Sequence, residues 1–131
     1  IFEATTIPAL EQSVNFTQRR HEVLAGNIAN IDTPGYKVRD LSPVKFEEKL
    51  KTAIEERNED HGSLSRYGYF PVDPFKEVGK DMEGILYHDD SNVTIEKQIV
   101  AMNKNWSRHN LVLTIMRNQF QLLETAISER V

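Results

Sequence analysis

The chain has 131 residues, the length of a single domain, and 39% of them are hydrophobic, which is enough for one core. A formal net charge of -4 at pH 7 gives no long-range attraction for nucleic acid, so no nucleic-acid partner is expected. The absence of cysteine excludes disulfides and thiolate metal sites, and no apolar stretch approaches the roughly 20 residues that span a bilayer, so no direct membrane insertion is expected.

Glycine and proline divide the chain into three segments. Nine of these eleven residues fall between positions 34 and 84, which leaves both ends free to form long helices. We therefore expect an N-terminal helix in residues 1–33, a middle segment with a short helix and a loop in residues 34–92, and a C-terminal helix in residues 93–131.

The N-terminal segment carries a stripe of residues at alternating steps of four and three. This spacing is a heptad pattern, and it predicts a helix with one face packed on a partner helix. Pro34 disfavours helical backbone at Thr33, so the helix should end between Asn30 and Asp32. The stripe consists of Leu10, Val14, Thr17, His21, Leu24, Ile28 and Ile31.

The middle segment follows a different pattern. Phe46, Leu50, Ala53 and Ile54 alternate with lysine and glutamate, which predicts a short amphipathic helix after Pro43. Residues 58–92 mix glycine, proline and aspartate with aromatic side chains, so we expect an irregular, partly extended loop that is mobile or orders on assembly.

The C-terminal segment repeats the heptad pattern at greater length. Thr94 is the expected N-cap of the helix, with Glu96 in the first turn at the positive end of the helix dipole. The stripe consists of Ile95, Ile99, Met102, Trp106, His109, Leu113, Met116, Phe120, Leu123 and Ile127.

The two stripes predict a mainly α fold, in which the terminal helices form an antiparallel, coiled-coil-like hairpin. The C-terminal stripe covers about nine turns and the N-terminal stripe about six, so a simple hairpin leaves about three turns unmatched. A second row beside the C-terminal stripe, made of Val112, Ile115, Leu122 and Ala126, widens the apolar face beyond what one helix covers. This surplus points to neighbouring subunits.

The chain carries no recognisable catalytic constellation. His21 and His109 occupy stripe positions, where a polar residue that sets helix register is a better interpretation than a pair of ligands. The run from His88 to Asp90, with Asp60 and His61, has neither EF-hand nor zinc-motif spacing. We therefore expect a non-enzymatic protein without metal or cofactor.

One stretch carries more than helix chemistry. It reads Asn27, Ile28, Ala29, Asn30, Ile31, Asp32, Thr33, Pro34, Gly35, Tyr36 and Lys37. Physically it is a helix stop, because Pro34 ends the helix and Gly35 permits a turn into an extended strand. The string is similar to the N-terminal signature of the bacterial flagellar axial proteins, and residues 92–97 resemble the C-terminal segment of the basal-body rod members of that family.

The resemblance implies a structural role in the flagellar basal body, most similar to the proximal rod proteins. Members of this family pair their terminal helices and polymerise into a hollow axial tube that transmits torque and conducts exported subunits. The implied partners are further copies, other rod proteins, and the membrane-ring adaptor and export gate at the rod base. The implied location is the periplasmic rod, reached by the flagellar type III system without a cleaved signal.

Three alternatives stay open at this point. A neighbouring rod protein of the same family differs little in its motifs. A free-standing helical-hairpin adaptor or chaperone would use the surplus stripe to hold a partner helix. An enzyme with a metal at His88, Asp89 and Asp90 is the weakest of the three.

Overall fold

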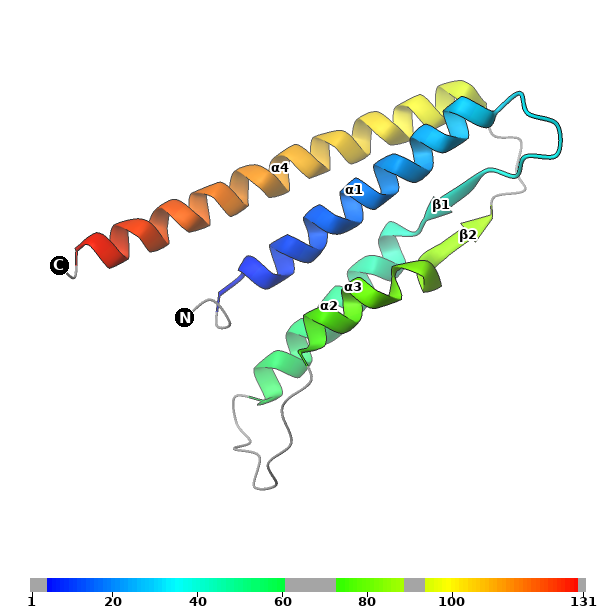
Figure 1. Cartoon of the computed structure of the whole chain (residues 1–131). Coiled ribbons are helices and arrows are strands. Elements are labelled where there is room, and N and C mark those ends of the chain that lie inside the picture. The colour runs from blue at the N-terminus through cyan, green and yellow to red at the C-terminus, as the bar shows by residue number, and fades with distance from the viewer. Residues whose placement is uncertain (1–4, 61–72, 89–93, 130–131) are drawn as a thin grey trace.

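A computed structural model describes residues 5–60, 73–88 and 94–129. Two long helices, α1 (Ile7–Asn30) and α4 (Ile95–Ser128), run antiparallel side by side (Figure 1). The elements between them are β1 (Arg39–Leu41), α2 (Pro43–Asp60), α3 (Pro74–Lys80), the 3-10 helix η2 (Asp81–Ile85) and β2 (Leu86–His88). The predicted mainly α fold with a hairpin of terminal helices is confirmed.

The helix ends follow the local sequence signals. Pro8 lies in the first turn of α1, where a missing N–H costs no intrahelical hydrogen bond. Helix α1 ends at Asn30, as Pro34 predicts. Thr94 caps α4, with its hydroxyl oxygen accepting a hydrogen bond from the Lys97 N–H at 3.4 Å.

The hydrophobic core lies between α1 and the middle segment. Its buried members are Phe16, Val23, Leu41, Phe46, Ala53, Phe75, Val78 and Ile85. The rings of Phe16 and Phe46 stack with centroids 4.2 Å apart, which joins α1 to α2. Helix α1 is thus buried on two sides, because its other face packs on α4.

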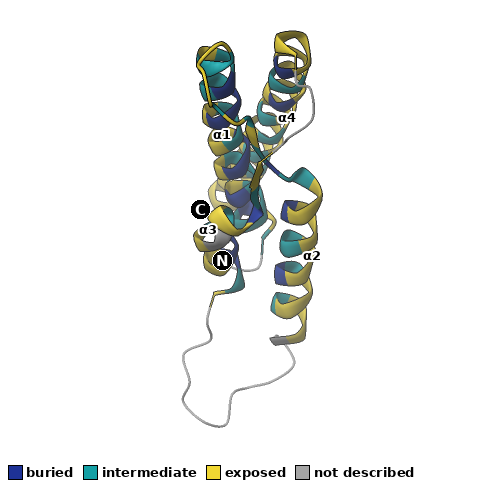
Figure 2. Cartoon of the chain, turned by 90° about the vertical axis from the view of Figure 1, so that its right-hand side faces the viewer, coloured by how far each residue is buried: buried dark blue, intermediate teal, exposed yellow. Residues whose placement is uncertain are grey.

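The middle segment is more regular than the sequence pattern predicts. Helix α2 spans 18 residues rather than a short stretch, and its buried positions lie on the side turned to the rest of the chain (Figure 2). Strands β1 and β2 pair antiparallel, with Asp40 opposite Tyr87. Strand β2 is an extended piece within the predicted loop, but residues 74–85 of that loop form α3 and η2 rather than irregular structure. Residues 61–72, which include several of the aromatic side chains of the predicted loop, lie outside the described part of the chain.

Candidate functional site

The seam between α1 and α4 has a polar centre. Asn105 donates from Nδ2 to the Thr17 carbonyl oxygen at 2.7 Å, and the Thr17 hydroxyl lies 2.7 Å from Nδ1 of His109. On α1, Thr17 and Leu24 of the predicted stripe are buried, and its other members are half-buried. The buried residues of α4 are both polar, Gln98 and Asn105. Hydrogen bonds therefore fix the register of the two helices.

The structure divides the predicted C-terminal stripe between two environments. Its half-buried members are Met102, His109, Met116 and Leu123, and its exposed members are Ile95, Ile99, Trp106, Leu113, Phe120 and Ile127. The face of α4 that meets α1 contains Gln98 and Asn105, one position before Ile99 and Trp106. Most of the apolar stripe therefore lies beside the intrachain seam rather than in it.

Exposed apolar side chains are concentrated on α4. In the described part of the chain, twelve large hydrophobic residues are exposed, and all but Val44 and Tyr87 lie on this helix. They include Trp106 at 51%, Leu111 at 60% and Leu122 at 64% exposure. The exposed large hydrophobic side chains of the described residues are thus concentrated on one helix rather than spread over the surface.

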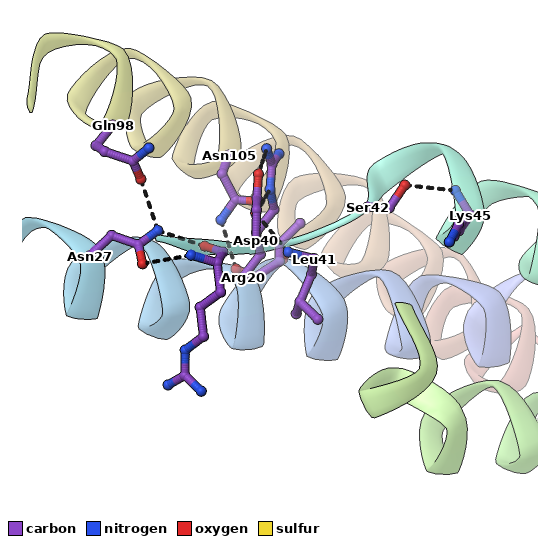
Figure 3. A network of polar contacts seen from close by, with 10 residues as sticks. Arg20, Asn27, Asp40, Leu41, Ser42, Lys45, Gln98 and Asn105 are labelled. Atoms are coloured by element: carbon purple, nitrogen blue, oxygen red, sulfur yellow. Dashed lines mark hydrogen bonds and ion pairs between the residues drawn. The ribbon is translucent and has the colours of Figure 1, made fainter. Parts of the chain in front are cut away.

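Asn27 is the hub that joins α1, β1 and α4 (Figure 3). Its Nδ2 donates to the Arg39 carbonyl oxygen at 2.6 Å and to Oε1 of Gln98 at 2.9 Å. Its Oδ1 accepts from the Tyr36 hydroxyl at 3.0 Å and from the Arg39 N–H at 3.2 Å. The side chain is fully buried, and both donors and both lone pairs of the amide are used.

The end of α1 is a folded turn. Asn30 donates from Nδ2 to the Gly26 carbonyl oxygen at 2.9 Å, which satisfies a carbonyl in the last turn of the helix. The Thr33 N–H donates to the Asn30 carbonyl oxygen, and the Tyr36 N–H to that of Thr33. Gly35 has φ of 77°, the left-handed region that glycine adopts without strain. The exposed residues of the turn are Asp32, Thr33, Pro34, Gly35 and Lys37.

Comparisons with known proteins match this same region and most of the chain. Residues 14–37 match the family described as "Flagella basal body rod protein". The chain is 32% identical over 117 residues to the flagellar basal body rod protein FlgB of Aquifex aeolicus, covering 89% of this chain and 88% of the relative. The chain belongs to the FlgB family of flagellar basal body rod proteins.

Other FlgB relatives also match over most of the chain. The chain is 31% identical over 133 residues to FlgB of Borrelia hermsii, covering 89% of this chain and 96% of the relative. It is 26% identical over 122 residues to FlgB of Salmonella typhimurium, covering 85% of this chain and 84% of the relative. No solved structure matches the chain. The expected family is confirmed, and these names favour FlgB over the neighbouring rod protein FlgC.

The structure shows what the segment matched by the rod-protein family does in this fold, which the sequence pattern did not show. The matched segment runs from the second turn of α1 to the exit turn, so it contains the buried hub Asn27 together with its partner Tyr36. Sequence reasoning treated this string as a helix stop. The Tyr36 hydroxyl, nine residues after Asn27, donates the hydrogen bond that links the turn to α1.

A second polar tie was missed from the sequence. Arg20 on α1 donates from Nε and Nη2 to the two carboxylate oxygens of Asp40, both at 3.0 Å, and the two side chains are only 14% and 15% exposed. Asp40 also accepts from the Leu41 N–H at 2.7 Å. A bidentate pair of this geometry holds β1 against α1 more firmly than a surface ion pair. Charge spacing along the sequence gives no signal for a contact across 20 residues.

The histidines do not form a metal cluster in the part of the chain that the structure describes. The Trp106 ring lies 5.5 Å from the His21 ring and 5.4 Å from the His109 ring, between centroids, so both histidines pack in the helix seam. Asp89 and Asp90 of the alternative metal site lie outside the described residues. Within those residues, no helix is both long and apolar enough to span a bilayer.

Replacing Gly35 by valine is expected to destabilise the chain by about 1–2 kcal/mol, because an L-residue with a Cβ is strained in the left-handed region. Space is not the obstacle, since no described atom lies within 4 Å of the position of an added Cβ. Urea unfolding of the purified chain measures the loss. Gly35→Asn is the matched control and should lose less, because asparagine tolerates this region. Equal stability of the valine variant and the wild type would show that the turn relaxes.

Proposed function

We propose that this FlgB-family chain is a structural subunit of the proximal rod that polymerises through its terminal helices into a hollow axial tube, which transmits torque and conducts exported subunits. The observation that supports polymerisation is the concentration of exposed apolar side chains on α4. Burying a large apolar side chain contributes about 1.5–3 kcal/mol, so covering several of them supplies a strong drive to associate.

Eight of the ten exposed large hydrophobic residues of α4 form two rows on different sides of the helix. The first row is Ile99, Trp106, Leu113, Phe120 and Ile127, each seven residues from the next. The other exposed row is Leu111, Ile115 and Leu122, so it keeps two members of the row predicted beside the stripe and lacks the half-buried Val112. Leu113 and Ile115 are two positions apart, a rotation of about 200°, so they project to nearly opposite sides of the helix, about 160° apart. The proposal assigns each row to a different neighbouring subunit.

Contacts through two different rows are heterologous, because one side of a subunit meets the other side of the next. Heterologous contacts generate rings when the rotation closes and helical filaments when it does not. A tube built of such contacts fits the rod named for the relatives. The rest of the described surface offers no comparable apolar area, since the exposed large hydrophobic residues outside α4 are Val44 and Tyr87.

The proposed partners follow from the family. They are further copies of this chain, other rod proteins, and the membrane-ring adaptor and export gate at the rod base. The proposed location is the periplasmic rod, reached through the flagellar type III system without a cleaved signal. The proposed interface residues are those of the two terminal stripes, and the exit motif at residues 27–37 is proposed to hold the hairpin in the form that assembles.

A helical-hairpin adaptor or chaperone is the second candidate, since the same apolar rows fit a partner helix. The second row distinguishes the two. One bound helix covers one groove, whereas two rows about 160° apart around the helix require two partners. The adaptor proposal also gives no reason for a match to FlgB over nearly the whole chain.

Fractionation of flagellated cells tests the proposal. We expect the chain to co-purify with basal bodies and to stay with the rod after detergent and alkaline washing. Deleting the coding sequence should abolish swimming, and expressing the chain again should restore it. Recovery only from the soluble fraction of cells that carry complete basal bodies would support an adaptor and overturn the proposed function.

A further inference from the structure

Helix α2 carries an acidic stripe on its outer side. The stripe consists of Glu48, Thr52 and Glu55, which lie four and three residues apart, so they share one side of the helix. All three are exposed. The buried residues of α2, Phe46 and Ala53, lie on the other side, and Figure 2 shows the exposed side of α2 turned away from the rest of the chain.

Helix α4 carries a basic stripe with the same spacing. It consists of Lys97, Ala101 and Lys104, and both lysines are exposed. The stripe lines a surface groove of about 420 Å³. In the part of the chain that the structure describes, neither lysine forms an ion pair. The groove keeps a net positive charge, because its other lining residues are Arg20, which is paired with Asp40, Glu96 and Val100.

The two stripes of one chain do not meet. Arg108 of α4 pairs with Glu47 of the same chain at 2.9 Å, which fixes the start of α2 beside the middle of α4. The acidic stripe begins one residue after Glu47. Lys97 lies eleven residues before Arg108, a distance of about 16 Å along the helix. The basic stripe is therefore left without the acidic stripe of its own chain.

Helices α2 and α4 run in the same direction within the chain. Asn27 joins the last turn of α1 to Arg39, which lies just before α2. Arg57, near the end of α2, donates to the Thr5 carbonyl oxygen at the start of α1 at 2.6 Å. Helix α2 is therefore antiparallel to α1, as α4 is (Figure 1). When all copies in an assembly point the same way, α2 of one copy meets α4 of another in parallel.

We propose that the acidic stripe of one copy docks on the basic stripe of the next copy. In the parallel arrangement Glu48 lies opposite Lys97, and Glu55 lies opposite Lys104. The central residue of each stripe is small, which lets the two helices approach. The contact is heterologous, because each copy offers one stripe of each kind, so it repeats from copy to copy.

The matched spacing favours a second copy as the occupant. On each helix the two charges are seven residues apart, or about 10.5 Å, so both ion pairs form in a single register. Exposed ion pairs contribute little affinity, and their main effect is to fix register and orientation. The affinity comes from the apolar rows of α4. Lys104 lies seven residues before Leu111, so a subunit that covers the row of Leu111, Ile115 and Leu122 is brought beside the basic stripe.

This inference rests on the proposed function, because it names the surfaces through which neighbouring rod subunits are aligned. It differs from contacts between terminal helices, since one of its two surfaces belongs to the middle segment.

Exchange of charges tests the contact. Lys104→Glu and Glu55→Lys are made singly and together, and each variant replaces the wild-type chain in cells. We expect each single variant to be incorporated into isolated basal bodies about fivefold less than the wild type, because a like-charge pair replaces an ion pair. The double variant should return close to the wild-type level, since opposite charges face each other again.

Arg117→Glu is the matched control, because Arg117 is an exposed base on another side of α4. Adding Glu55→Lys should not raise its incorporation. Wild-type incorporation of both single variants would overturn the contact, and so would an equal gain from Glu55→Lys in the control. A loss that the double variant does not reverse would assign the basic stripe to an acidic segment of another protein and overturn the contact between copies. Absence of the wild-type chain from basal bodies would instead reject the proposed function.

A cross-link leaves all four charges in place and supplies a second test. The chain has no cysteine, so Thr52→Cys is introduced in one copy and Ala101→Cys in a co-expressed copy that carries a size tag. The two residues lie opposite one another in the proposed register, and a disulfide requires Cα atoms within about 7 Å. We expect oxidised basal bodies to give a dimer of one tagged and one untagged chain that disappears on reduction.

Ser107→Cys in place of Ala101→Cys is the control for the cross-link. Ser107 is an exposed residue of α4 that projects about 120° away from Ala101 around the helix. It should give no mixed dimer. Mixed dimers in equal amount from both pairs, or none from the test pair, in basal bodies that contain both copies would contradict the contact.

Discussion

Replacing Asn27 by leucine is expected to lower the free energy of unfolding by about 3 kcal/mol or more. Leucine is close in size but removes all four hydrogen bonds of the hub. The Arg39 peptide groups and the Gln98 amide then lose buried partners, and each unsatisfied group costs about 1–3 kcal/mol. The shift of the urea unfolding midpoint of the purified chain measures this loss.

Asn30→Leu is the matched control for the hub. Asn30 lies one turn further along α1 and makes one short side-chain bond, to the Gly26 carbonyl oxygen at 2.9 Å. It is half-buried, so its loss should cost about 1 kcal/mol. If the two variants lost equal stability, Asn27 would not be the tie between α1, β1 and α4.

Replacing Leu122 by aspartate is expected to leave the free chain folded and to abolish swimming. Leu122 is 64% exposed, so the carboxylate stays hydrated and the free energy of unfolding changes by less than about 0.5 kcal/mol. In an assembled rod the same carboxylate would be buried without a partner, which costs several kcal/mol. Thermal unfolding of the purified variant and the swimming zone of complemented cells measure the two effects.

Phe16→Ala shows the opposite behaviour and serves as the comparison. Phe16 is 1% exposed and stacks on Phe46, so its truncation should cost about 3–5 kcal/mol of folding stability. Loss of swimming by Phe16→Ala would accompany a lower unfolding temperature, whereas loss by Leu122→Asp would not. An unfolding temperature of Leu122→Asp as low as that of Phe16→Ala would show that Leu122 stabilises the single chain.

The helix limits were predictable because they depend on local chemistry. Pro34 acts on the backbone of its neighbour, and Thr94 caps a helix through a residue three positions away. Both effects act within one turn of chain. The heptad stripes likewise predicted two long helices that pair.

The choice of packing partner was not predictable in the same way. A heptad stripe shows that a face is covered but does not identify the covering element. On α1 the stripe faces α4, while Phe16 and Val23, which lie outside the stripe, pack against the middle segment. On α4 the contact with α1 passes through Gln98 and Asn105, so much of the apolar stripe is left exposed.

The buried polar residues show most clearly what the sequence pattern could not predict. Periodicity assigns asparagine and glutamine to the solvent side of a helix, because burying an amide is unfavourable without partners. Asn27 is buried because the Arg39 backbone, Tyr36 and Gln98 supply those partners from three other elements. Such an arrangement depends on the tertiary fold, so helical periodicity gives no signal for it.

The most direct test of α4 as the assembly surface is the amount of Leu122→Asp recovered in isolated basal bodies, relative to Gln121→Asp. The two variants add the same charge to adjacent exposed residues of one helical turn, but only Leu122 belongs to an apolar row. With equal expression of both variants, we expect Gln121→Asp to be incorporated at the wild-type level and Leu122→Asp to be absent. Incorporation of Leu122→Asp at the level of Gln121→Asp would contradict the assignment of the α4 rows to subunit contacts.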